Sequence, residues 1–337
     1  MSERTKISVA VITYNQQDTI RQTLDSILMQ KGDFDLELVI GEDCSTDNTG
    51  AICDEIANRV NSEERKDRIV RVIHNSPNLG ITANYFRTLQ ACTGEYIGDI
   101  AGDDYYCDDH ALEKQLHYLQ NHTEVGLLGA NGYRLYVKRN EKVLGENELV
   151  NKLDAKDFFF SPKYKGGVII QGGGVMFRRE LLQYIDFDEI IRRKLPVEDY
   201  PIQAIWSQHT KFWRLDDPIV VYRVYKESST FVSFEHPKYL SYHKGLAETR
   251  RYLNELFPAD ACFSEKELQE YEFYKEFLLY LHQCNYWKAK QLIADASAIA
   301  DTPKVQQAQR FTKTWLHFMA AHIIKEYKHH KDIKQRT

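Results

Sequence analysis

Four short apolar runs, separated by stretches with helical spacing or by polar turns, constrain the fold of this chain more than any other feature. The runs are residues 7–13, 36–41, 69–74 and 95–100, and the first is the β-branched segment ISVAVIT. Apolar residues without alternation are typical of strands that are buried on both faces. Strands that alternate with helices at this spacing predict a parallel sheet with right-handed crossovers, and therefore an α/β fold.

Polar groups stand at the carboxyl ends of three of these strands. They are Tyr14-Asn15, Glu42-Asp43 and Asp103-Asp104. In open α/β sheets, ligands bind outside the carboxyl ends of the strands. Because the three groups come from separate parts of the sequence and meet at one edge, the sequence predicts a binding site there.

The pair Asp103-Asp104 has two interpretations. Adjacent carboxylates repel each other, and a divalent cation that carries a phosphate relieves this repulsion. Aspartates are also favoured in turns and at helix N-termini, where they need no ligand. The residues alone do not decide between a metal site and a cap.

Composition narrows the class of protein. The chain has 337 residues, of which 43% are hydrophobic and 28% charged, so it can bury a core. A net charge of −5 argues against a nucleic-acid partner. No apolar run approaches 18 residues and no secretory segment precedes the first strand. The six cysteines form no CxxC pair and indicate reduced thiols, so we expect a cytoplasmic protein.

Four segments together resemble glycosyltransferase family 2. They are ITYN (12–15), EDCSTDNT (42–49), NLG (78–80) and GEYIGDIAGDDYY (94–106). The resemblance extends over residues 5–225 and implies a GT-A fold, a mostly parallel sheet flanked by helices. It also implies a hexosyltransferase that uses a nucleotide sugar.

The resemblance assigns residues to the donor. It implies that the nucleotide sugar, UDP-linked with a hexose or N-acetylhexosamine, contacts Thr13, Tyr14, Asn15, Glu42, Asp43, Asn78 and Asp103. It further implies that Asp104, together with Asp103, holds Mg²⁺ or Mn²⁺.

A second acid pair, Glu198-Asp199, precedes a short amphipathic run. Acids also favour the first turn of a helix, so capping alone would explain the pair. The resemblance instead implies that Asp199 is the general base of an inverting enzyme, and that Glu198 and Trp206 contact the acceptor. The implied acceptor is a hydroxyl of a growing cell-surface glycan, free or lipid-linked.

Several positions depart from the family pattern. Ala101 stands where the leading Asp of D-x-D-D is usual, Cys44 replaces a Gly, and Tyr225 stands where a His is frequent. These departures keep open a nucleotide-sugar-binding or scaffolding protein with impaired catalysis. A sugar-1-phosphate nucleotidyltransferase would need a Gly-rich basic loop after the first strand, where ITYN stands instead.

The last hundred residues predict only helices, so we expect a catalytic domain at 1–232 and a helical region at 233–337. The predicted helices are 237–256, 265–283, 286–300 and 305–331. In the last one, Trp315, Phe318, Met319, Ile323 and Tyr327 share a face and basic residues follow. This face fits peripheral contact with the inner, anionic membrane surface. Packing on the catalytic domain or in a homodimer fits equally.

Overall fold

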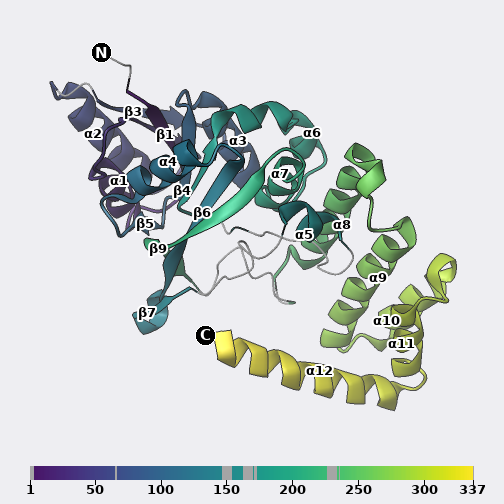
Figure 1. Ribbon diagram of the computed structural model, residues 1–337. Coiled ribbons are helices and arrows are strands. Elements are labelled where there is room, and N and C mark those ends of the chain that lie inside the picture. Colours follow the sequence, from purple (N-terminus) through teal and green to yellow (C-terminus); the bar gives the residue numbers. More distant parts are fainter. Residues whose placement is uncertain are drawn as a thin grey trace. The chain divides into compact units, whose positions relative to one another are not determined.

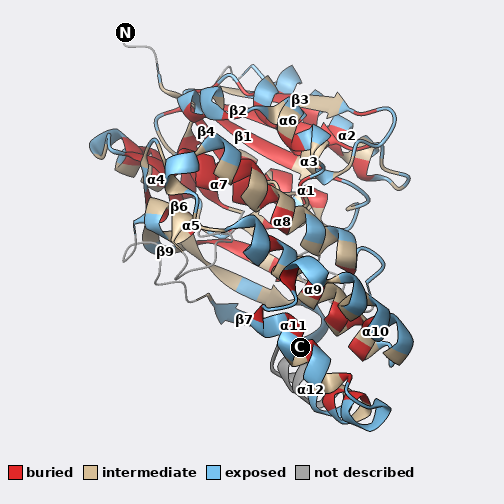
Figure 2. Ribbon diagram, turned by 90° about the vertical axis from the view of Figure 1, so that its right-hand side faces the viewer, coloured by how far each residue is buried: buried red, intermediate tan, exposed pale blue. Residues whose placement is uncertain are grey.

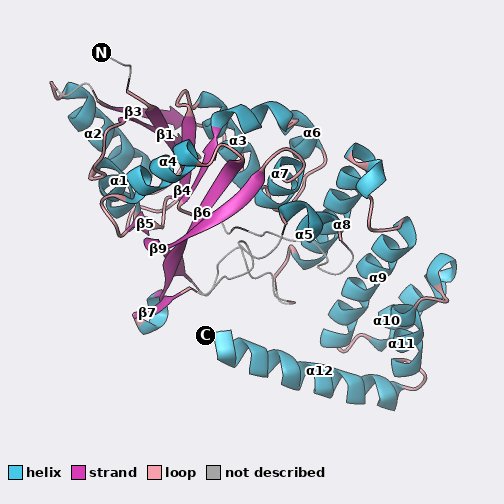
Figure 3. Ribbon diagram, in the orientation of Figure 1, coloured by secondary structure: helices cyan, strands magenta, loops and turns pink. Residues whose placement is uncertain are grey.

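The computed structural model describes residues 4–64, 67–145, 154–161, 170, 173–225, 234 and 236–336, with side chains up to residue 325. The chain divides into two compact units, residues 1–192 with 197–225 and residues 193–196 with 226–337. Within the described residues, the first unit contains the strands and the second is helical (Figure 3). The boundary predicted at 232/233 lies outside the described residues.

The first unit is one mixed sheet with helices on both faces (Figure 1). Its strands are β1 (Lys6–Thr13), β2 (Asp35–Glu42), β3 (Arg68–His74), β4 (Tyr96–Ala101), β5 (Tyr105–Tyr106), β6 (Val125–Tyr136), β7 (Glu141–Leu144), β8 (Val175–Arg178) and β9 (Lys211–Val224). Its helices are α1 (Ile20–Leu28), α2 (Thr49–Ser62), α3 (Ile81–Ala91), α4 (Ala111–Asn121), α5 (Ala155–Phe160), α6 (Phe187–Arg192) and α7 (Asp199–Trp206), with 3₁₀ turns η1 (Val137–Arg139) and η2 (Arg179–Tyr184).

The strand order is β3-β2-β1-β4-β8-β6-β9-β5, and β7 pairs with β6. The four strands predicted from the apolar runs form the parallel part, β3-β2-β1-β4. Beyond β4 the sheet is mixed: β8 runs antiparallel to both β4 and β6, whereas β6 and β9 are parallel. The strands beyond β4 therefore extend the parallel part of the sheet. The strand order within that parallel part follows from its crossovers.

Both faces of β1, β2 and β4 are covered, as their apolar runs predict, whereas the edge strand β3 is partly exposed, with Ile69 44% exposed. Val9 and Val11 of β1 pack with Leu24 and Ile27 of α1 in the main core. Ala10, which points to the other face, is also buried, and α3 lies against β1 and β2 on that side. Figure 2 shows the buried residues concentrated along these central strands.

The carboxyl ends of the parallel strands lie level with one another. The register pairs Thr13 with Glu42, Glu42 with His74, and Ile12 with Ala101. The residues that follow these positions in the chain therefore emerge at one edge of the sheet, where the candidate site is built.

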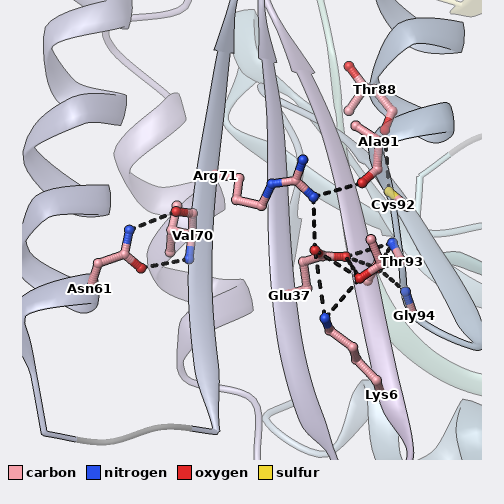
Figure 4. A network of polar contacts seen from close by, with 11 residues as sticks. Lys6, Glu37, Asn61, Val70, Arg71, Thr88, Ala91, Cys92, Thr93 and Gly94 are labelled. Carbon is pink, nitrogen blue, oxygen red and sulfur yellow. Dashed lines mark hydrogen bonds and ion pairs between the residues drawn. The ribbon is translucent and has the colours of Figure 1, made fainter.

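The opposite end of the sheet is held by the buried carboxylate of Glu37 (Figure 4). It accepts hydrogen bonds from the Ser8 hydroxyl, the Thr93 amide at 2.8 Å and the Arg71 guanidinium at 3.1 Å, and Lys6 lies 3.8 Å away. Burial alone would raise the Glu37 pKa, but the hydrogen bonds from Ser8, Thr93 and Arg71 hold it below its ordinary value.

We expect Glu37→Ala to lower the free energy of unfolding by about 3 kcal/mol, because several buried donors lose a charged partner. A carboxyl whose pKa is depressed by folding stabilises above its unfolded pKa and loses that contribution as the pH falls through its folded pKa. The difference between variant and parent should therefore shrink on acidification. Urea unfolding at several pH values measures it, and Asp109→Ala, at an exposed ion pair with Lys31, is the control. Equal losses in both variants would contradict the prediction.

The second unit consists of α8 (Tyr239–Leu256), α9 (Glu265–His282), α10 (Tyr286–Asp295), α11 (Pro303–Phe311) and α12 (Trp315–Arg336), with 3₁₀ turns η3 (Pro258–Asp260) and η4 (Ser297–Ile299). Ser264 begins α9 with a reciprocal capping box to Glu267. Phe277 of α9 and Phe318 of α12 are fully buried in the shared core. In the described chain, no helix has both the length and the apolar character needed to cross a membrane.

Two predictions about the C-terminal helices are wrong. The single helix expected at 305–331 is two helices, since α11 ends at Phe311 before α12 begins at Trp315. The predicted common face is also divided: Phe318 is buried, whereas Trp315 and Ile323 are 55% and 63% exposed. Packing against α9 and α10 selects Phe318 and Ala321 as the inner face. The side chain of Tyr327 and the basic side chains beyond it lie outside the described ones.

Candidate active site

Asp43, the residue after β2, organises the loop that leads into α3. Its Oδ1 accepts hydrogen bonds from the Asn75 side chain and the Leu79 amide, both at 2.8 Å, and its Oδ2 accepts one from the Gly80 amide at 2.9 Å. The Asn78 side chain donates to the Asp43 carbonyl at 2.7 Å. Asp43 and Asn78, both predicted to contact the donor, are thus parts of one connected loop.

The loops after β1 and β2 are bonded to each other. Asn15 accepts a hydrogen bond from the Thr46 amide at 2.8 Å, and its own amide donates to the Ser45 hydroxyl at 3.0 Å. Buried Glu42 accepts from the Ser45 amide at 2.7 Å. Cys44 has a left-handed φ of 60°, which explains why glycine suits this position in the family pattern. Thr13 is buried and Tyr14 is 47% exposed beside these loops.

Asp103 and Asp104 close β4 beside one arginine. Oδ1 of Asp104 accepts a hydrogen bond from the Arg223 amide at 2.8 Å. The Arg223 guanidinium donates to the Asp103 carbonyl and to the Gln22 side chain, and it lies 4.8 Å from the ring centre of Tyr105. Burial raises the pKa of both aspartates, and for Asp104 the neighbouring Asp103 raises it further.

This acid pair fits a divalent cation. Two adjacent carboxylates supply the hard oxygen ligands that Mg²⁺ and Mn²⁺ prefer. Asp104 is only 1% exposed, but the glycine at position 173 leaves space beside its Oδ2, because a Cβ there would lie 3.2 Å from that oxygen. Within the described residues no group of three or more His, Cys, Asp or Glu could hold a metal ion. A cation at this pair would therefore complete its shell with phosphate oxygens and water, as Mg²⁺ often does.

The second acid pair starts α7. Asp199 is the first residue of the helix, and Glu198, which precedes it at the N-cap, makes no capping hydrogen bond with its side chain. Burial raises the Asp199 pKa to about 6, and burial together with the Asp199 charge raises the Glu198 pKa to about 8. A carboxyl with a pKa near 6 is suited to accept a proton near neutral pH.

Sequence reasoning missed Asp99, a buried carboxyl in the middle of β4. It points to the face that carries α3 and α7, where the Tyr85 hydroxyl donates to its Oδ2 at 2.7 Å. Burial and the nearby charge of Asp199 raise its pKa to about 7. An acid inside an otherwise apolar strand was the signal that could have revealed it.

Trp206 was predicted to contact the acceptor, but the structure buries it. Only 2% of its surface is exposed, its ring lies 4.7 Å from that of Phe177, and its indole N–H donates to the Leu181 carbonyl at 2.8 Å. This correction follows from α7 being apolar around most of its circumference, which draws Trp206 into the core.

Comparison with known proteins identifies the family. The model of "Glycosyl transferase family 2" matches residues 8–185. The chain belongs to this family. Among curated relatives, the uncharacterized protein Rv1520 of Mycobacterium tuberculosis is 38% identical over 118 residues, which is 35% of this chain and 32% of the relative. The chain thus matches about a third of that relative's length.

Solved structures confirm the GT-A fold. TarS 1–349 of S. aureus in complex with UDP-GlcNAc has a TM-score of 0.53 at 16% identity, covering 99% of this chain and 93% of that one. The mannosyltransferase PcManGT of Pyrobaculum calidifontis, in complex with GDP-Man and Mn²⁺, has a TM-score of 0.50 at 18% identity, covering 96% and 87%. At these identities the likeness establishes the fold of this family 2 chain and no more.

Proposed function

We propose that this protein is an inverting glycosyltransferase that moves a hexose or N-acetylhexosamine from a UDP-sugar to an acceptor hydroxyl. The observation that carries the proposal is that two groups of acids lie along β4, one just after its carboxyl end and one beside its middle. Asp103-Asp104 closes the strand, and Asp199 lies across a small void from Asp99 in its middle. One strand thereby links a group suited to a diphosphate and a group suited to a proton transfer.

In this mechanism the donor lies at the carboxyl edge of the sheet. Thr13, Tyr14 and Asn15 at the end of β1, with Glu42 and Asp43 at the end of β2, would contact the nucleotide. Asp103 and Asp104 would hold Mg²⁺ or Mn²⁺ with the diphosphate. When bound, that cation would neutralise the charge that develops on the departing UDP. Arg223, fixed between Asp103 and Asp104, adds a permanent positive charge at the same end of β4.

Asp199 would act on the acceptor. As the acceptor oxygen attacks the anomeric carbon, its proton passes to the Asp199 carboxylate and the bond to UDP breaks. Attack from the side opposite the leaving group inverts the anomeric configuration. Glu198, whose raised pKa keeps it protonated near neutral pH, would donate a hydrogen bond to the acceptor.

The donor is the first part of the proposal to test. TarS was solved with UDP-GlcNAc and PcManGT with GDP-Man and Mn²⁺, so both nucleotides belong in a thermal-shift screen with Mg²⁺ or Mn²⁺. We expect UDP-sugars to stabilise the protein, by about 2.7 kcal/mol at 100 times the dissociation constant. Stabilisation without any transfer or donor hydrolysis would instead favour the binding or scaffolding protein that Ala101 and Tyr225 leave open.

We also propose that the acceptor is a glycan, free or lipid-linked, met at the cytoplasmic face of an anionic membrane. The support is an exposed apolar strip on α12, formed by Trp315, Leu316, Ile323 and Ile324, of which Leu316 is 72% exposed. The sequence that follows is rich in Lys and Arg. Such a surface binds anionic lipid through both apolar burial and charge.

Deletion of residues 315–337 removes this strip but also the buried Phe318, so substitution is the cleaner test. We expect Leu316→Glu with Ile323→Glu to abolish salt-sensitive binding to vesicles that contain phosphatidylserine, without lowering the melting temperature. Flotation measures binding, and Trp287→Glu, at a 76% exposed residue of α10, is the control. Unchanged flotation contradicts the membrane contact, and conversion of a dimer to a monomer would assign the strip to self-association.

A further inference from the structure

A small buried chamber lies between β4, β8 and α7 in the first unit. Its volume is about 10 Å³, and its polar lining consists of Tyr85, Asp99, Asp199, Gln203 and Trp206. A bound water needs on the order of 10–15 Å³. The chamber therefore holds one water at most and is no sugar pocket, so its acids face each other or a single water.

Three of the five polar side chains that line the chamber already have hydrogen-bond partners. The Tyr85 hydroxyl donates to Asp99, and the Trp206 indole donates to the Leu181 carbonyl. The Gln203 amide donates to the Ile170 carbonyl at 2.6 Å and accepts from the Ile170 amide at 3.1 Å. Among the described residues that line the chamber, this leaves the carboxyl groups of Asp99 and Asp199 to interact with each other.

The ionisable groups around Asp99 also indicate that it interacts with Asp199. Asp99 makes no ion pair with any residue of the described chain, and Tyr85 is its hydrogen-bond donor there. The ionisable groups that interact with it come from α3, from β5, from the turn after β4 and from the start of α7. They are Tyr85, Cys92, Tyr106, Asp104, Glu198 and Asp199. Without a cation among them, two adjacent carboxylates avoid repulsion by retaining one proton.

We propose that Asp99 is a positioning residue for Asp199: it keeps the proton that the two carboxyl groups share and donates a hydrogen bond, direct or through one water, that holds the Asp199 carboxylate towards the acceptor. The inference rests on the proposed role of Asp199 as the base. Tyr85 fixes the Asp99 carboxyl from α3 by occupying Oδ2, which leaves Oδ1 to carry the shared proton.

The pKa directions agree with this assignment. Burial raises both pKa values, and the Asp199 charge adds to the rise at Asp99, to about 7 against about 6 for Asp199. As the pH rises, Asp199 therefore ionises first while Asp99 retains its proton. A further rise in pH removes the second proton and with it the hydrogen bond, so turnover should rise with the first ionisation of the pair and fall with the second.

Two substitutions distinguish a positioning role of Asp99 from a packing role. We expect Asp99→Ala to lower kcat by about 10- to 100-fold with little change in the donor KM, because a hydrogen bond to a charged group is lost. Asp99→Asn keeps a donor towards Asp199 and an acceptor for Tyr85, and should restore most of that loss. Because Asn cannot ionise, its pH–rate profile should lack the alkaline limb that belongs to Asp99, and the rate should fall only at the higher pH where Glu198 ionises.

The matched control is Tyr106→Phe. Tyr106 is buried on the opposite face of β4, where its hydroxyl lies 3.6 Å from the position of a Cβ on Gly98. Removing that hydroxyl should leave both limbs of the pH–rate profile in place. An alkaline limb that stays at the parental pH in Asp99→Asn, or an equal loss in Asp99→Ala and Asp99→Asn, would overturn the positioning role.

A second measurement is independent of catalysis. In protein with ¹³C-labelled aspartate, NMR should show a carboxyl that titrates near pH 7 and is absent from Asp99→Asn. In Asp199→Asn the midpoint of that titration should move to lower pH, since the neighbouring charge is gone. An unmoved midpoint overturns the shared proton even if the enzyme transfers sugar. A moved midpoint in a protein that transfers no sugar supports the pair and contradicts the proposed function alone.

Discussion

Asp199→Asn is expected to lower turnover of the nucleotide sugar by about 10²- to 10⁴-fold, the usual contribution of a general base. Asn keeps the shape and the hydrogen-bonding capacity of Asp but cannot accept the proton of the acceptor. Donor affinity, measured by calorimetric titration with UDP, should change little because the proposed nucleotide contacts lie at the strand ends. The residual rate should also lose the acid limb expected near the Asp199 pKa of about 6.

A helix-capping role for Asp199 predicts a different result. Asp157 stands in the first turn of α5 in the same unit, and Asp157→Asn is therefore the matched control. If Asp199 served only the helix dipole, both substitutions would cost a few tenths of a kcal/mol to about 1 kcal/mol of stability. Both variants would then retain turnover, and the role as base would be wrong.

Asp104→Asn is expected to remove the part of the UDP affinity that depends on Mn²⁺. Changes to groups that merely support a metal ligand already cost 10–100-fold, so loss of a charged ligand should cost about 100-fold or more. Asn can still accept the hydrogen bond from the Arg223 amide, so the fold of the strand end should survive. Calorimetric titration with UDP, with and without Mn²⁺, separates the metal-dependent part from the rest.

The control for this experiment is Asp108→Asn. Asp108 lies four residues further along, where it is bonded to Lys114 at 2.7 Å rather than placed beside Arg223. Its substitution should leave the Mn²⁺ effect unchanged. Parental Mn²⁺ dependence in Asp104→Asn would contradict the metal site and leave Asp103-Asp104 as a turn stabilised by Arg223.

The parallel half of the sheet was predictable because each of its strands is a nearly continuous apolar run. Those runs also located the strand ends, and with them the edge where Tyr14, Asp43 and Asp103 emerge. The order of β8, β6 and β9 was not predictable, since antiparallel insertion beyond β4 depends on tertiary pairing and not on local pattern. The split between α11 and α12 was missed because the short turn between Phe311 and Trp315 barely interrupts helical spacing.

The candidate site was predictable only where its residues stand in recognisable pairs. Asp103-Asp104 and Glu198-Asp199 are visible as adjacent acids, whereas Asp99 is a single acid whose meaning depends on α7 packing against β4. Trp206 shows the opposite error: an aromatic residue next to an acid pair suggests a sugar contact, and only its burial reveals a packing role. Contacts between residues that are distant in the sequence depend on the fold, and no local sequence pattern predicts them.

The anomeric configuration of the product tests the central claim most directly. With an α-linked UDP-sugar as donor and methanol as surrogate acceptor, the methyl glycoside formed cannot mutarotate, so NMR reports its configuration unambiguously. The account predicts a β-glycoside, formed by the parent protein and not by Asp199→Asn. An α-glycoside, or a β-glycoside formed equally well by Asp199→Asn, would contradict an inverting mechanism with Asp199 as its base.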